Sequence, residues 1–548
     1  MAGLSCKVDS SVAMVEQLLS TRVFHYLNLD LGDTLSGFDN YTLPESVLGA
    51  IDYVEPTGIL RPSPKFRTRG SSKERNRLEK AAAKIRRRRA DPDIGPQTLR
   101  DLYHIPPNNQ STSPHNGIGI YEPGLATWLP DDLDLFFATY QPEIKGQRPS
   151  VMSIAGGYRD PHTTDEYFIV ESNLDFEYAM ALAHPQAVVT LQVNDPEHVG
   201  SLTAMLRAFN QPHCQVSVDT PDGPVVRAVP LEELEHEHGV GANCTALQTP
   251  NVVSISYAWG ERDFAPDYLR RQCLEFLKLG LQGVTVVVAS GDSGPARHYD
   301  GACVDGATGA DAKGAAGGDF VANWPAACPW VTVAGGTQLR RQTERVVAWR
   351  NRPSAAWTAG GAKGDEQVRP LETDRDLDPE KEVAYARHVK GRSRSSGGGF
   401  SALFPAPWYQ RPAVSAYLAH EADHLAALAG RFNASGRAYP DVAALAAGFA
   451  VATGGTRQLV YGTSASAPVF AAVVARVNDV RRAAGRSAVG FVNPVLYARP
   501  EALTAITSGA NVGCGVEEAF RAQGRWSPVT GLGSPDYEKL VETFMALP

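Results

Sequence analysis

The chain has 548 residues, 43% of them hydrophobic, and a formal net charge of −8 at pH 7. This length and composition suit a large α/β catalytic domain with a smaller appendage. The negative charge argues against a nucleic-acid-binding protein, and no apolar run approaches the roughly 20 residues that span a bilayer, so we expect no nucleic-acid partner and no membrane span.

Residues 1–65 are predicted to form a small α+β appendage, with strand-like segments at 4–8 and 22–29 and a helix at 10–19. Residues 66–91 form a basic linker that contains the run from Arg86 to Arg89. A nucleic-acid patch is the alternative, and it is disfavoured because no aromatic residues alternate with these charges. Since proteases cut exposed linkers, we expect a domain boundary and a processing site here. No secretion signal is predicted in the chain as given.

Residues 92–548 are predicted to form one α/β domain around a parallel sheet. Short β-branched runs predict buried strands at 151–154, 187–193, 252–257, 284–289 and 330–334. Helical periodicity occurs between them, at 175–183 and 268–281. Two long inserts, 301–318 and 352–399, are predicted to be surface loops.

The seven cysteines form no C-x-x-C pair, so disulfides or buried thiols are expected in place of a zinc site. Cys303 has two candidate partners, Cys328 and Cys514, between which the sequence does not decide. Glycosylation sequons at Asn40, Asn109, Asn243 and Asn433 suggest the secretory route.

A small-residue turn delivers Ser464 to the start of an apolar run at 469–475. Such a turn can present a nucleophile near the positive end of a helix, although a simple helix cap is the commoner explanation. A serine nucleophile needs a base, and none of the 13 histidines stands in the His-Gly-Thr setting that subtilisin-like proteases use. The cluster from Glu235 to His238 is interpreted as a solvated face, because its members do not share one side of a helix.

Carboxylates are therefore the candidate partners of Ser464. Glu171 and Asp175 stand four residues apart, which places both on one face where an apolar helix is predicted to begin. Two carboxyls held together share protons, and one can stay ionised beside a protonated neighbour in mild acid. Asp292 follows the predicted strand at 284–289, and the carboxyl end of such a strand is where open α/β sheets bind ligands. The alternatives are an acidic first helical turn and an Asx turn.

These three motifs together resemble the sedolisins, or serine-carboxyl peptidases, and especially their lysosomal tripeptidyl peptidase branch. The resemblance covers about residues 94–548 and includes Ser396-Gly-Gly-Gly-Phe-Ser401 and Trp526-Ser-Pro-Val-Thr-Gly. It implies a subtilisin-like parallel sheet flanked by helices. It also implies a role for each site residue: Ser464 as nucleophile, Glu171 as general base, Asp175 as the acid that orients Glu171, and Asp292 as the protonated donor to the oxyanion.

The resemblance further implies an acid-acting serine-type peptidase that releases tripeptides from free N-termini of peptides or unfolded proteins. Endopeptidase action and a catalytically silent binding protein are the alternatives. The expected compartment is the lysosome or vacuole, or the exterior of the cell. Residues 1–65 resemble only the second half of the family's propeptide, so we expect a partial propeptide that inhibits its own catalytic domain, on a truncated chain.

One departure from the family concerns calcium. The two aspartates of the family's C-terminal calcium site correspond to Ala505 and Ser527, and Arg525 adds a positive charge nearby. A hard cation needs carboxylate ligands, so we expect no calcium, or only weak binding through carbonyls, and no other cofactor.

Overall fold

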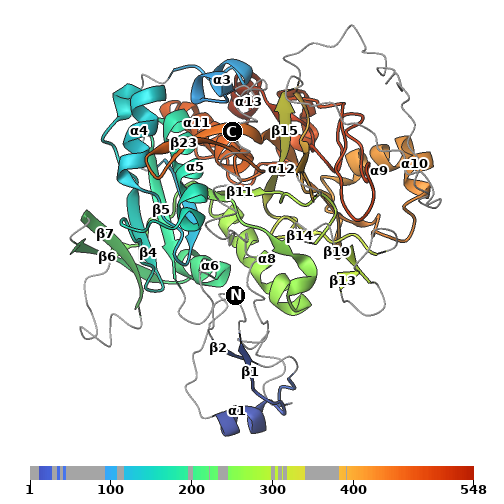
Figure 1. Cartoon of the computed structure of the whole chain (residues 1–548), viewed down its shortest axis with the longest axis horizontal. Coiled ribbons are helices and arrows are strands. Elements are labelled where there is room, and N and C mark those ends of the chain that lie inside the picture. Colours follow the sequence, from blue (N-terminus) through green and yellow to red (C-terminus); the bar gives the residue numbers. More distant parts are fainter. Residues whose placement is uncertain are drawn as a thin grey trace, which may run out of the picture.

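A mainly parallel sheet organises the catalytic region, as the predicted strands require (Figure 1). The computed structural model describes residues 12–27, 34–37, 41–44, 93–107, 116–194, 201–220, 223–231, 245–297, 303–305, 311–312, 318–339, 382–389 and 392–548. Within these ranges the sheet has 11 strands, ten of them in the order β16-β15-β11-β9-β3-β5-β4-β7-β6-β8, while β21 also pairs with β15. From β15 to β7 the neighbouring strands are parallel.

The strands of this sheet are β3 (Gly117–Pro123), β4 (Ser150–Ile154), β5 (Ala187–Val193), β6 (His213–Thr220), β7 (Gly223–Pro230), β8 (Thr245–Ala246), β9 (Val252–Ile255), β11 (Thr285–Ala289), β15 (Thr332–Leu339), β16 (Glu382–Ala384) and β21 (Val442–Leu445). The helices are α3 (Pro96–Leu102), α4 (Pro130–Tyr140), α5 (Glu166–Ala183), α6 (Leu202–Asn210), α8 (Pro266–Leu281), α9 (Arg411–His420), α10 (Ala422–Ala426), α11 (Ser466–Ala483), α12 (Asn493–Ala498) and α13 (Tyr537–Met545). Short antiparallel pairs join β10 (Trp259–Gly260) to β14 (Asn323–Trp324), β12 (Cys303–Val304) to β13 (Asp311–Ala312), β17 (Ala386–Val389) to β18 (Arg392–Ser395), β19 (Gly399–Pro405) to β20 (Gly436–Tyr439), β22 (Ala447–Thr453) to β23 (Thr456–Tyr461) and β24 (Leu503–Thr504) to β25 (Ser534–Pro535).

The sheet separates two hydrophobic cores because its strands are apolar on both faces. Along β11, Val287 faces the core that contains α5 and α11, whereas Val286 and Val288 face the core that contains α6 and α8. This alternation is the period of two that side chains follow along a strand. The α/β fold with helices on both faces, expected from the sequence, is confirmed.

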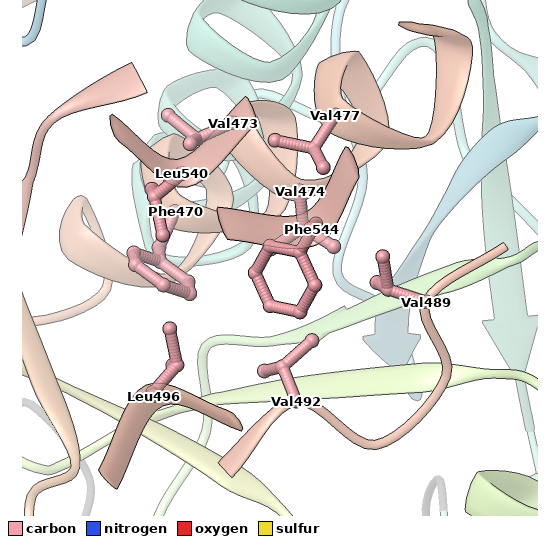
Figure 2. Close-up of a pocket in the computed structure, with 9 residues that line it drawn as sticks. All are labelled: Phe470, Val473, Val474, Val477, Val489, Val492, Leu496, Leu540 and Phe544. Atoms are coloured by element: carbon pink, nitrogen blue, oxygen red, sulfur yellow. The ribbon is translucent and has the colours of Figure 1, made fainter. Parts of the chain in front are cut away.

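Helix α11 lies against the middle of the sheet and packs on α5. Its far side meets α12 and α13, where nine apolar side chains surround a small void of about 10 Å³ (Figure 2). The lining side chains are Phe470, Val473, Val474, Val477, Val489, Val492, Leu496, Leu540 and Phe544. A void of this size without polar groups gives a water molecule nothing to bind, so the packing around it is apolar. At the end of α11, Arg481 adds a hydrogen bond to the Phe544 carbonyl of α13. Among the described residues, no helix has the length and apolar character needed to cross a bilayer.

Two boundaries differ from the sequence-based predictions. Helix α5 begins at Glu166, before the predicted start at residue 175, because polar residues in its first turns hid the helical period. The end of the insert at 352–399 is not a surface loop: β16 joins the main sheet beside β15, and residues 382–385 are buried. Glu382 explains that burial, since it accepts hydrogen bonds from the hydroxyls of Tyr103, Thr337 and Ser534.

Long-range cysteine pairing is resolved in the described part of the chain. Cys303 pairs with Cys514, and Cys273 pairs with Cys328. Of the four sequons, only Asn433 lies among the described residues. Its side-chain amide donates to the Ser401 carbonyl at 3.3 Å, and its side-chain oxygen accepts from the Ser435 hydroxyl at 2.7 Å.

The N-terminal elements are α1 (Val12–Leu18) and the antiparallel pair of β1 (Phe24–Leu27) and β2 (Thr34–Gly37). They confirm the predicted helix at 10–19 and the core of the predicted strand at 22–29, and Figure 1 shows them below the α/β body. The strand predicted at 4–8, Cys6, the basic linker at 66–91 and the Glu235–His238 cluster lie outside the described residues.

Candidate active site

Ser464 lies in the short connection between the β22–β23 hairpin and α11, so the hairpin delivers it directly to the helix. Its hydroxyl donates to the carbonyl of Ser256 at 3.3 Å, and the Ser256 hydroxyl returns a bond of the same length to the Ser464 carbonyl. Ser256 follows β9 immediately. Ser464 is therefore held against the carboxyl end of a central strand, where it is only half-buried and can meet a substrate.

Glu171 and Asp175 project from the second and third turns of α5, not from its first turn as predicted. Burial raises the pKa of Glu171 to about 7, a hydrogen bond from Ser464 opposes that rise, and the charge of Asp292 adds to it. Glu171 thus has both the nucleophile and the candidate oxyanion donor within electrostatic reach.

Asp175 is fully buried beneath Glu171, and neither of its carboxylate oxygens has a hydrogen-bond partner among the described residues. Burial and the charges of Glu171 and Glu122 raise its pKa well above the ordinary value. A carboxyl in such surroundings keeps its proton, because ionising it would place a second charge in a dry site.

Asp292 follows β11 in a turn shaped by glycines. Its Oδ1 accepts from the backbone N–H of Thr463 at 2.7 Å and from the Thr463 hydroxyl at 3.0 Å. Its Oδ2 faces Gly462, where a Cβ atom would lie only 2.6 Å away. Burial raises the pKa of Asp292 despite the opposing hydrogen bonds from Thr463 and the charge of Arg394. One oxygen is therefore anchored next to Ser464, and the other remains to carry a proton.

Glu122 is a further acidic residue of the site that the sequence-based reasoning missed. It stands near the end of β3, is fully buried, and accepts a 2.7 Å hydrogen bond from Ser172. Burial raises its pKa to about 8, and the charge of Glu171 contributes. A carboxylate directly after the apolar run at 117–121, still within the same strand, is the signal that could have identified it, because charged residues are almost never buried without a role or a partner.

The three acids on α5 and β3 do not ionise together. Burial leaves Glu171 with a pKa of about 7, Glu122 with about 8 and Asp175 higher still. Of the three carboxyls on the α5 side, Glu171 is therefore the first to lose its proton, and it is also the one that Ser464 contacts. This order suits Glu171 as a base beside protonated neighbours.

The topology explains why these residues meet. Glu122, Ser256 and Asp292 mark the carboxyl ends of β3, β9 and β11, which are adjacent and parallel in the sheet. Glu171 lies on α5 and Ser464 lies just before α11, and these two helices pack against each other over the same strands. The structure thus brings together all four residues predicted from the sequence, at the edge where open α/β sheets place their ligands.

The C-terminal loop carries no carboxylate at either of the two positions expected to bind calcium. The Ser527 hydroxyl pairs with that of Thr530 at 3.1 Å, and the Ser527 N–H donates to the Gly531 carbonyl. Neither Ala505 nor Ser527 can replace an aspartate as a ligand, so the absence of calcium stays a prediction.

Comparisons with known proteins agree on one relationship. No protein-family model matches the chain. Tripeptidyl-peptidase SED1 of Arthroderma otae is 39% identical over 461 residues, which are 83% of this chain and 64% of that protein. Tripeptidyl-peptidase sed1 of Aspergillus fumigatus is 34% identical over 573 residues, covering 98% of this chain and 80% of the relative. Aorsin of Aspergillus oryzae is 33% identical over 567 residues, covering 97% and 80%.

Among solved structures, a Pseudomonas sedolisin, described as a serine-carboxyl proteinase complexed with two molecules of pseudo-iodotyrostatin, matches with a TM-score of 0.52 and 19% identity. The match covers 84% of this chain and 100% of that one. At this identity the likeness concerns the fold.

Proposed function

This chain belongs to the sedolisin family of peptidases, and from that premise we propose that it is a serine-type peptidase that acts in acid and releases tripeptides from free N-termini. The observation that carries the proposal is the contact of Ser464 with Glu171, the buried carboxyl that ionises first among its neighbours on α5 and β3. The relatives named as tripeptidyl-peptidases support the choice of product.

The first half of the reaction forms an acyl-enzyme. Ionised Glu171 takes the proton of the Ser464 hydroxyl while Oγ attacks the carbonyl carbon of the third residue. Protonated Asp292 donates from Oδ2 to the oxygen that becomes negative, because Oδ1 is already held by Thr463. Glu171 then gives its proton to the leaving amine, and the peptide bond breaks.

The second half repeats these roles with water. Glu171 takes a proton from the attacking water, Asp292 again donates to the oxyanion, and Ser464 recovers its proton as the tripeptide acid leaves. Asp175 and Glu122 do not contact the substrate. Because burial raises the pKa of both, they stay protonated and neutral, and Glu171 is the carboxyl of these three that carries the negative charge. Every step requires ionised Glu171 and protonated Asp292, so the pair must hold one proton, a state that lies between the pH at which both carboxyls are protonated and the pH at which both are ionised.

A peptide assay tests this proposal. Acid-treated protein is incubated at acid pH with a peptide that has a free N-terminus and with its N-acetylated copy, and the products are identified by mass spectrometry. We expect successive tripeptides from the free peptide only. The variants Ser464→Ala and Glu171→Gln should lose this activity, whereas the exposed Ser487→Ala should keep it.

The alternatives have distinct outcomes in the same assay. Internal cuts in both peptides would establish endopeptidase action. Cleavage that does not depend on Ser464 would refute the serine-type mechanism, and a protein that cleaves nothing would be a silent binding protein.

We extend the proposal to the setting of the enzyme. An acidic lysosome or vacuole, or an acidic exterior, suits the protonation states above, and the disulfides suit an oxidising route. The N-terminal elements are proposed to inhibit the catalytic domain before the basic linker is cut. Their addition as a separate polypeptide should slow the mature enzyme, and no effect at micromolar concentration would contradict this role.

A further inference from the structure

The hairpin of β22 and β23 leads directly to Ser464, yet its two strands pair only with each other and not with the main sheet. An isolated two-stranded ribbon is marginally stable, so its position depends on what it packs against. Strand β22 is buried along its whole length and packs on α5 and α4, whereas the first half of β23 is exposed. The groups that join β22 to these helices therefore help to decide where Ser464 stands.

Polar side chains of α5 bind the edge of β22 that faces away from β23. The backbone groups on this buried edge need partners from outside the hairpin. Asn173 donates to the Ala452 carbonyl at 2.8 Å, and the Ala452 N–H donates to the Glu177 carboxyl, at 3.1 Å to Oε1 and 3.3 Å to Oε2. Asn173 and Glu177 are four residues apart and share one face of α5, while Glu171 and Asp175 share another. One helix thus holds the hairpin with one face and meets Ser464 with the other.

A second buried acid, Asp132 in the first turn of α4, binds the tip of the same hairpin. Its carboxylate accepts the N–H groups of Gly454 and Gly455 at 2.9 and 2.8 Å and the Asn173 amide at 3.0 Å. Asp132 and Glu177 are both buried, and neither forms an ion pair with a basic side chain of the described residues. Asp132 also acts electrostatically on Glu177. Two buried acids without a cation tolerate one negative charge better than two.

The proton of Glu177 links the position of the hairpin to pH. Burial raises the pKa of Glu177 well above the ordinary value, the hydrogen bond from Ala452 opposes the rise, and the charge of Asp132 adds to it. If the hairpin moves away from α5, Glu177 meets water and loses its proton at the ordinary pKa. The closed position is therefore fully favoured below that ordinary pKa and loses this advantage as pH rises toward the raised one. Each pH unit in this range favours the open position by up to about tenfold.

No other group that faces Glu177 reverses this effect. Burial raises the pKa of Tyr140 on α4 and of Tyr178 beside Glu177 on α5, so both phenols stay neutral over this range. On β23, Arg457 lies in register with the residue of β22 that binds Glu177, but it pairs with Asp93.

Resting on Ser464 as the nucleophile of the proposed function, we propose that Glu177 is a positioning residue whose proton keeps the β22–β23 hairpin, and with it Ser464, in the catalytic arrangement. In acid, protonated Glu177 and Asn173 fix β22 on α5. Toward neutral pH the hairpin separates from α5, and Ser464 loses its alignment with Ser256 and Glu171. A group that does not touch the substrate thereby helps to restrict the site to acid.

Hydrogen exchange followed by mass spectrometry tests the hold on the hairpin directly. Protection factors, corrected for the intrinsic exchange rate, are measured on the full chain at about pH 4.5 and about pH 7.5, on either side of which a raised carboxyl pKa acts. The peptides compared cover residues 447–461 and, as an internal reference, β11. The proteins are the wild type, Glu177→Gln, Asn173→Ala and the control Glu542→Gln, on the exposed side of α13.

We expect the protection of 447–461 in the wild type and in Glu542→Gln to fall by about tenfold or more between these pH values, and that of β11 to fall less. Glu177→Gln should lose most of this fall, because glutamine keeps an acceptor for the Ala452 N–H and has no proton to release. Asn173→Ala should lower the protection of the hairpin by a similar factor at both pH values, because the hydrogen bond that it removes does not titrate.

Activity provides a second readout. At the acid optimum, Glu177→Gln should keep the kcat of the wild type for a neutral peptide, because glutamine resembles the protonated acid. Glu177→Ala leaves the Ala452 N–H without its acceptor and should lower kcat about tenfold. KM should change little in either variant, since Glu177 does not contact the substrate.

The outcomes separate this proposal from the proposed function. An equal fall in protection in the wild type and Glu177→Gln would overturn the role of Glu177, and so would equal falls in the hairpin and β11, which indicate unfolding of the whole domain. If Glu177→Gln does not fold, Asp132→Asn replaces it: loss of the neighbouring charge should reduce the fall, and an unchanged fall would overturn the proposal. A wild type that releases no tripeptides refutes the proposed function, whereas the exchange results still decide whether Glu177 holds the hairpin.

Discussion

Replacing Asp292 by asparagine is expected to change the shape of the pH dependence as well as its height. In the wild type, activity requires ionised Glu171 and protonated Asp292, so the two groups together must hold one proton. At low pH both are protonated, and at high pH both lose their protons; burial raises the pKa of Glu171 to about 7 and also raises the pKa of Asp292. The wild-type profile is therefore a bell whose maximum lies in acid.

The structure lets asparagine replace the donor without moving it. Its Oδ1 can accept the 2.7 and 3.0 Å hydrogen bonds from Thr463, which places the amide nitrogen where Oδ2 faces Gly462. An amide donates at every pH, so the fall in activity at high pH should disappear. Because an amide is a weaker donor than a carboxylic acid, we expect about a tenfold loss at the acid optimum, against roughly 100- to 1,000-fold for Asp292→Leu, which removes the donor.

The assay is kcat/KM for one neutral peptide from about pH 3 to pH 9, with stability to irreversible unfolding checked at each pH. The Asp292→Asn profile should rise to a plateau in place of the bell. A bell with an unchanged fall at high pH would refute the role of Asp292 as a proton-dependent donor, because the titrating group would then be another residue.

Three other changes test the site and its support. Gly462→Ala should lower kcat by roughly 100-fold or more, because the added Cβ would lie 2.6 Å from Oδ2 of Asp292. Gly485→Ala is the control: this glycine also has a positive φ, but no atom lies within 4 Å of an added Cβ, so kcat should not change. Burial raises the pKa of Glu122 from 4.5 to about 8, so between these pH values the folded state keeps a proton that the unfolded chain loses, and the free energy of unfolding should fall as pH rises. Glu122→Gln should reduce this fall by at most about 5 kcal/mol, measured by urea unfolding at both pH values. A fall that is unchanged in Glu122→Gln would contradict the raised pKa of Glu122. Calcium should not raise the melting temperature, and a rise of several degrees would show that the C-terminal loop binds the ion without carboxylates.

The candidate catalytic residues were accessible from sequence because each belongs to a local pattern. Glu171 and Asp175 are one helical turn apart, and Asp292 follows a run of β-branched residues that can only be a buried strand. Helix α5 and strand β11 confirm those elements, although α5 begins earlier than predicted. The boundaries proposed at residues 65 and 91 remain predictions, since they fall outside the described residues.

Contacts between distant segments were not accessible, because no local period records them. Glu122 joins the site only because β3 lies beside β9 in the sheet, and Cys303 meets Cys514 across 211 residues of sequence. The hairpin of β17 and β18 lies in a segment whose composition indicated a loop, yet backbone hydrogen bonds between Ser395 and the Asp292 turn place its end beside Asp292.

The sequence by itself determined the chemical type of the site, a serine with carboxylate partners, since side-chain identity and local spacing are properties of the chain. Only the tertiary structure decided how strongly burial raises the pKa of each carboxyl and which charges stand near it. Those properties depend on burial and on distances between segments, and both exist only once the sheet has formed and α5 and α11 have packed across it.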